Sequence, residues 1–221
     1  MSFPEPPSHP EIPYPFPPVR ERPQRTDPVL VPMVEMPEPP GLAALRDRRT
    51  TMVSGPLDAA QVTRVCAELM SFDGASEDEV VLVLNSTGGP LREVAPLLDV
   101  LDAMRAPVAI RCIGAAAGTA AVLLANGTGT RAAAQHASIT LRCDHPEPAT
   151  GAAGELQRHA EELRGLTDRF AQAVAARSRL DVDQVVTELE RGSSRSAREA
   201  LEAGLVDEVL TPRAGQLRPG R

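Results

Sequence analysis

A glycine- and alanine-rich stretch, CIGAAAGTAAVLLANG at residues 112–127, has the pattern of a turn that leads into a helix of small residues. Turns of this kind often hold a nucleophilic side chain at the start of the helix, where it attacks a carbonyl group. The only hydroxyl in this stretch belongs to Thr119, and Gly118 occupies the place where a serine is expected. The pattern is therefore that of an acyl-transfer site without its usual nucleophile.

A second glycine turn, NSTGG at residues 85–89, follows the apolar run VVLVL. Where a strand ends and a helix begins, backbone N–H groups point into the same space and stabilise a developing oxyanion. Gly88 and Gly89 fit this role, although tight turns and close packing explain the glycines equally well.

These turns need strands and helices to position them. Continuous apolar runs and alternation predict buried strands, and apolar residues at i, i+3, i+4 and i+7 predict helices. Asp58 is a predicted N-cap, and one face of the helix at 155–177 carries Leu156, Ala160, Leu163, Leu166 and Phe170. The alternation predicts an α/β fold with crossover connections. Its strands are expected at 50–55, 80–84, 108–112, 138–141 and 205–210. Its helices are expected after Asp58, after the turn within the stretch 112–127, and at 91–104, 155–177, 181–190 and 196–203.

Composition excludes several classes of protein. A net charge of −7 argues against a nucleic-acid surface, and no run approaches the roughly 18 apolar residues that span a membrane. The first residues lack the pattern of a secretory signal. Cys66, Cys112 and Cys143 lie far apart without a CxxC motif, which argues against a zinc site or a disulfide framework. We therefore expect a protein of the reducing cytoplasm with no metal and no cofactor.

The chain divides into three predicted parts. Residues 1–40 hold fourteen of the 22 prolines, so residues 1–41 are expected to form a disordered extension. Phe3, Tyr14 and Phe16 are three of the five aromatic residues, and such a segment suits docking in the groove of a partner. A folded domain is expected at 42–211, followed by a short flexible tail at 212–221.

The order of four segments resembles the ClpP family of caseinolytic protease subunits. They are VVLVLNSTGG, RCIGAAAGTAAVLLANG, HAEELRGLTDRFAQAVAARSRLDVDQV and SAREALEAGLVDEVL, and the resemblance covers about residues 42–211. It implies a ClpP/crotonase-like β/α superhelix with a protruding handle helix. It further implies seven-membered rings, stacked in pairs with other ClpP-type subunits, and a Clp ATPase that feeds unfolded clients into the chamber.

The family's Ser-His-Asp triad is absent from the matching positions. Its motifs place the serine at Gly118, the histidine at Arg142 and the aspartate at Gly192. An arginine stays protonated and cannot act as a base. The resemblance also assigns oxyanion and substrate-backbone binding to Gly88, Gly89 and the amide of Thr119.

Three functions follow as alternatives. The first is an inactive, ClpP-like subunit with a structural or regulatory role in a Clp protease complex. The second is a peptidase subunit that uses displaced groups, for which Thr119, Cys143 and His145 are the candidates. The third is a stand-alone scaffold or adaptor that recruits partners through its proline-rich extension.

Overall fold

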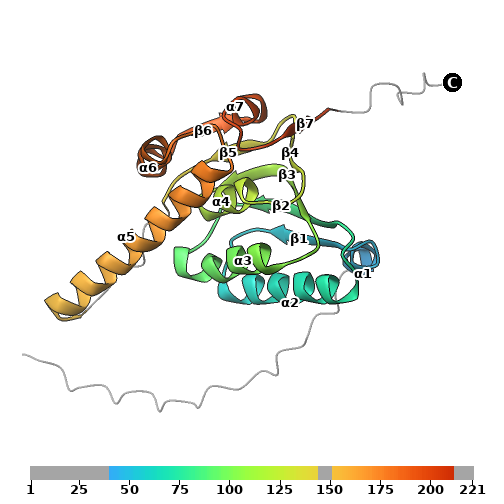
Figure 1. Ribbon diagram of the computed structural model, residues 1–221, viewed down its shortest axis with the longest axis horizontal. Coiled ribbons are helices and arrows are strands. Elements are labelled where there is room, and N and C mark those ends of the chain that lie inside the picture. Colours follow the sequence, from blue (N-terminus) through green and yellow to red (C-terminus); the bar gives the residue numbers. More distant parts are fainter. Residues whose placement is uncertain (1–39, 144–150, 212–221) are drawn as a thin grey trace, which may run out of the picture. The chain divides into compact units, whose positions relative to one another are not determined.

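The structure, a computed structural model, describes residues 40–143 and 151–211 and consists of a largely parallel sheet with helices packed against it (Figure 1). Five parallel strands follow the order β1-β2-β3-β4-β7, while β5 pairs in parallel with β3 and antiparallel with β6. The predicted α/β class is confirmed. The strands are β1 Thr50–Ser54, β2 Val80–Ser86, β3 Val108–Ala117, β4 Arg131–Ala134, β5 Ser138–Thr140, β6 Ser194–Ser196 and β7 Glu208–Leu210.

The helices agree with the predicted order, with one addition at the start. Asp58 caps α2 as predicted, because its carboxylate accepts a 2.8 Å hydrogen bond from the Gln61 amide. The unpredicted α1 begins at Pro40, where proline needs no amide partner in the first helical turn. The helices are α1 Pro40–Arg46, α2 Ala59–Ala75, α3 Leu91–Ala103, α4 Thr119–Ala125, α5 Ala153–Ala176, α6 Val182–Arg191 and α7 Ala197–Glu202. The remainder of the predicted extension, the C-terminal tail from residue 212 and His145 lie outside the described residues.

Strand β3 is longer than the sequence predicts. It was expected at 108–112, but it continues through the Gly-Ala run to Ala117. Its first half pairs with β4 at Ile110–Cys112, and its second half pairs with β5 at Ala115–Ala117. Alanine and glycine have weak strand preference alone, so pairing with two successive neighbours overrides local propensity. The extension carries Gly118 to the end of β3.

Helix α4 lies in the centre of the core. All seven of its residues are buried, and it packs against β2, β3, α3 and α5. A helix that is apolar on every side is stable only inside a protein, so the sequence TAAVLLA dictates this position. The N-terminus of α4 is therefore fixed firmly at the end of β3.

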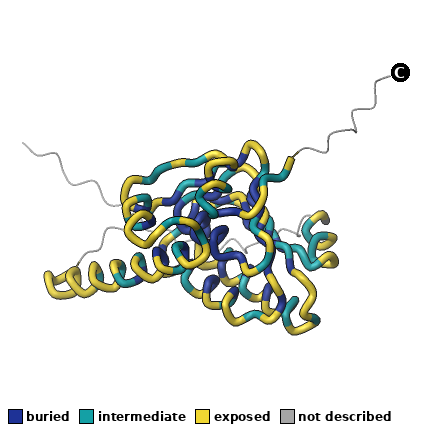
Figure 2. Tube along the Cα trace, turned by 45° about the horizontal axis from the view of Figure 1, so that its top comes forward, coloured by how far each residue is buried: buried dark blue, intermediate teal, exposed yellow. Residues whose placement is uncertain are grey.

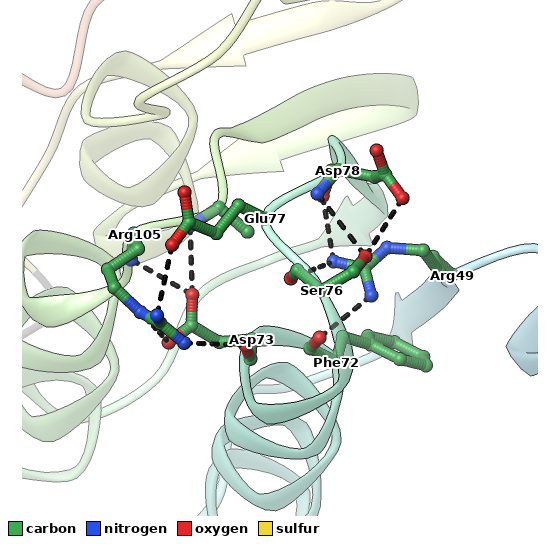
Figure 3. Close-up of polar contacts among 8 residues, drawn as sticks. Arg49, Phe72, Asp73, Ser76, Glu77, Asp78 and Arg105 are labelled. Carbon is green, nitrogen blue, oxygen red and sulfur yellow. Dashed lines mark hydrogen bonds and ion pairs between the residues drawn. The ribbon is translucent and has the colours of Figure 1, made fainter.

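Two arginines fasten the C-terminal end of α2 (Figure 3). The Arg49 guanidinium donates hydrogen bonds to the carbonyl oxygens of Phe72 and Asp78, both at 2.7 Å. On the other side, Asp73 accepts hydrogen bonds from the amides of Arg105 at 2.9 Å and Ala106 at 2.8 Å. These contacts connect α2 to the starts of β2 and β3, and so support the register of the parallel strands.

Helix α5 is buried only toward its C-terminal end. Leu166, Phe170 and Val174 lie in the core, whereas the side chain of Leu156 is 38% exposed. Figure 2 shows the first half of this helix as an exposed segment. The predicted apolar face therefore packs in the core over the C-terminal part of the helix, and it is exposed at Leu156 near the N-terminal end. Among the described helices, none combines the length and the apolar character required to cross a bilayer.

Candidate active site

Gly118 forms the sharp turn between β3 and α4. Its backbone has φ 58° and ψ −130°, and its amide donates a 2.9 Å hydrogen bond to the carbonyl oxygen of Thr140 at the end of β5. Side chains rarely tolerate this conformation, but a strained strand-to-helix turn is what presents the nucleophile in many serine hydrolases. The turn is therefore built like a nucleophile elbow, and the residue at its tip has no side chain.

Arg142 and Gly192 lie beside each other. Gly192 ends α6 in the left-handed conformation, with φ 69° and ψ 41°, and its amide donates to the Glu188 carbonyl at 2.9 Å. A Cβ atom placed on Gly192 would lie 3.5 Å from the Cβ of Arg142. The neighbouring amide of Cys143 donates to the Leu189 carbonyl at 2.8 Å, which holds the segment after β5 against α6.

The three positions predicted to match a nucleophile, a base and an orienting acid are thus arranged around the end of β5. Gly118 is bonded to Thr140, two residues before Arg142, and Arg142 adjoins Gly192. A glycine, an exposed arginine and a glycine provide no proton acceptor at these positions.

The side chain of Thr119 connects the two glycine turns. Its Oγ1 accepts a 2.8 Å hydrogen bond from the Gly89 amide and donates a 3.0 Å hydrogen bond to the Gly89 carbonyl. Thr119 is only 1% exposed. Sequence reasoning singled out both residues but missed this contact, because they are 30 positions apart and no spacing pattern connects them.

Thr119 and Cys143, the described candidates for a displaced nucleophile, lie in different settings. The Thr119 hydroxyl donates its proton to the Gly89 carbonyl, which cannot activate it. The Sγ of half-buried Cys143 lies 3.7 Å from the Thr167 hydroxyl, which itself donates to the Leu163 carbonyl at 3.0 Å. Thr119 and Cys143 therefore have different hydrogen-bonding partners, and none of these contacts involves a base that would activate either one.

The described histidines lie elsewhere. The Nδ1 atom of His159 is 2.9 Å from the Arg92 guanidinium, where α5 meets α3, and His136 is exposed between β4 and β5. Burial raises the pKa of the Cys112 thiol to about 11, and burial also raises the pKa of Cys66, so neither thiol is activated. The described residues contain no group of three or more His, Cys, Asp or Glu side chains arranged to hold a metal ion.

Comparison with known proteins gives a consistent result. The family model described as Clp protease matches residues 41–213. The chain is 34% identical over 172 residues to a putative ATP-dependent Clp protease proteolytic subunit-like protein of Streptomyces coelicolor, which covers 76% of this chain and 82% of that protein. It is 29% identical over 171 residues to the ATP-dependent Clp protease proteolytic subunit 2 of Streptomyces avermitilis, covering 76% and 86%. A third similar protein, subunit 1 of Thermobifida fusca, is 28% identical over 176 residues, covering 79% of both chains.

Proposed function

Because the chain belongs to the Clp protease family, we propose that it is a catalytically inactive, ClpP-like subunit with a structural or regulatory role in a Clp protease complex. The observation that carries the proposal is Gly118. It stands at the tip of a turn with the backbone geometry of a nucleophile elbow, and it has no atom with which to attack a carbonyl.

The neighbouring positions support the same conclusion. Arg142 stays protonated and cannot accept a proton from a nucleophile, and Gly192 has no carboxylate to orient a base. Loss of a full triad removes about 10⁶-fold in rate, and binding and oxyanion stabilisation alone leave about 10³–10⁴-fold over water. For peptide bonds this remainder is negligible.

The proposed partners are other ClpP-type subunits, in homomeric or mixed rings, and a Clp ATPase. Two exposed apolar side chains are consistent with assembly, since Leu156 on α5 is 38% exposed and Met70 on α2 is 62% exposed. All three cysteines are free, which supports the cytoplasm as the proposed location.

The alternatives have less support. A displaced nucleophile at Thr119 would have to break two partly buried hydrogen bonds to Gly89 before it could react. The adaptor function depends on the proline-rich extension, which lies outside the described residues.

One purification separates the three functions. The full chain would be sized on a column, assayed with a fluorogenic peptide and treated with a fluorophosphonate that labels activated serines. We expect a large oligomer that neither hydrolyses the peptide nor reacts with the fluorophosphonate. Co-purification with Clp subunits from its own cells would identify the complex. Hydrolysis above background would favour the peptidase that uses displaced groups. A monomer without peptidase activity would favour the adaptor.

A further inference from the structure

We propose that the Thr119 hydroxyl closes the oxyanion site from within, by occupying the position that a substrate carbonyl oxygen would take against the Gly89 amide. This inference rests on the proposed function, because it assigns a second and independent block to the same inactive site. It makes Thr119 a positioning residue that keeps the Gly89 amide engaged and so withholds it from a substrate.

The two hydrogen bonds between Thr119 and Gly89 carry the inference. A backbone amide has one proton, and the Gly89 proton is already donated to Thr119 Oγ1 at 2.8 Å. The reciprocal 3.0 Å bond from the hydroxyl to the Gly89 carbonyl orients the oxygen lone pairs toward the amide. Thr119 is 1% exposed and Gly89 is half-buried, so water has restricted access to the two hydrogen bonds.

The surrounding contacts hold both partners in place. Thr119 is the first residue of α4, whose every residue is buried, so its backbone has little freedom. On the other side, the Gly88 amide donates to Ser86 Oγ at 3.0 Å, and the Gly88 carbonyl accepts from the Leu57 amide at 3.0 Å. A substrate carbonyl would therefore have to displace a fixed hydroxyl rather than a loosely held water molecule.

Hydrogen–deuterium exchange at the Gly89 amide tests the inference directly in the full chain. Exchange would be resolved at single residues by fragmentation mass spectrometry, with the Gly88 amide as internal control because its acceptor is Ser86. Thr119→Ala should speed exchange at Gly89 about tenfold, while Thr119→Ser, which keeps the hydroxyl, should not. Thr119→Val also removes the acceptor but keeps the side-chain volume, so it should speed exchange at Gly89 as well. It replaces the alanine variant in the comparison if that variant folds poorly. Unchanged exchange at Gly89 in the alanine and valine variants overturns the inference.

A second measurement asks whether opening the site matters for chemistry. The triple variant Gly118→Ser, Arg142→His, Gly192→Asp would be treated with a fluorophosphonate, with and without Thr119→Ala. Restoring one oxyanion donor should raise the labelling rate about 10²-fold. Labelling no faster with Thr119→Ala than without it overturns the inference. Labelling of the wild type would instead contradict the proposed function, so the two failures are distinguishable.

Discussion

A Cβ atom on Gly192 would lie 3.5 Å from the Cβ of Arg142, so these two positions face each other although one of them has no side chain. The end of α6 supplies one and the segment after β5 supplies the other, and the bond between Cys143 and Leu189 keeps them together. A side chain introduced at position 192 would therefore begin next to the first side-chain carbon of an arginine.

This proximity predicts a ranking of substitutions at Gly192. Gly192→Ala should lower the free energy of unfolding by about 1 kcal/mol, because the left-handed conformation at φ 69° disfavours a Cβ. Gly192→Asn should cost less, since asparagine tolerates this conformation. Gly192→Asp should be more stable than Gly192→Asn by about 0.5 kcal/mol through attraction to Arg142. Urea titration at neutral pH measures all three, and an aspartate variant no more stable than the asparagine variant contradicts the pairing.

The ion pair between Arg131 and Asp207 predicts a dependence of stability on pH. Hydrogen bonds from the Arg131 guanidinium, at 2.5 and 3.0 Å, and from its amide, at 2.9 Å, join β4 to the start of β7. The side-chain bonds from Arg131 lower the pKa of Asp207, although burial opposes the shift. A carboxylate with a lowered pKa stabilises the fold above its unfolded pKa of about 4, and this contribution is lost as the pH falls through the folded value.

Asp207→Asn should therefore cost less than about 1 kcal/mol at pH 7, because the Asp207 side chain is 45% exposed and solvent screens the pair. The difference from wild type should shrink as the pH falls below about 4. Urea titrations at a series of pH values measure it, and addition of 1 M salt at pH 7 serves as a control that should also narrow the gap. If the difference in unfolding free energy between wild type and Asp207→Asn stays constant below about pH 4, the assignment to this ion pair is contradicted.

The sequence predicts most of the framework, because it rests on local patterns. Short stretches of sequence are enough to recognise the Asp58 cap, the apolar run of β2 and the helical spacing in α2 and α5. The second half of β3, which the sequence did not predict, is different. Ala115–Ala117 become strand only because β5 pairs with them, and that partner lies more than twenty positions away.

The candidate site is predictable by position but not by contact. Motif matching selected Gly118, Arg142 and Gly192 along the chain. The adjacency of Arg142 and Gly192 depends on how α6 packs after β5, and the bond from Gly89 to Thr119 crosses from one crossover unit to the next. Such contacts are set by tertiary packing, which periodicity does not encode.

The exposed half of α5 predicts an effect on assembly. Leu156 is 38% exposed, so Leu156→Glu should weaken the proposed oligomer by placing a charge in an apolar interface, while leaving the subunit folded. Leu166 lies in the core at 8% exposure, so a charge there would test stability instead. Sizing chromatography with light scattering should show smaller species for Leu156→Glu. Gln172→Glu, at an exposed site of the same helix, should leave the size unchanged, and an unaltered mass for Leu156→Glu would count against this surface.

The chemistry of the site gives the last prediction. Gly118→Ser places a hydroxyl at the tip of the turn, but Arg142 stays protonated and accepts no proton from it. The variant should hydrolyse a fluorogenic peptide no faster than wild type, with both at background, because triad members act as a unit. It should also be less stable by about 1 kcal/mol or more, since φ 58° and ψ −130° strain a serine. Thermal unfolding and the peptidase assay measure both effects. Ala115→Ser, two residues before the end of β3, controls for adding a hydroxyl nearby, and activity in Gly118→Ser alone would show that a group other than Arg142 accepts the proton.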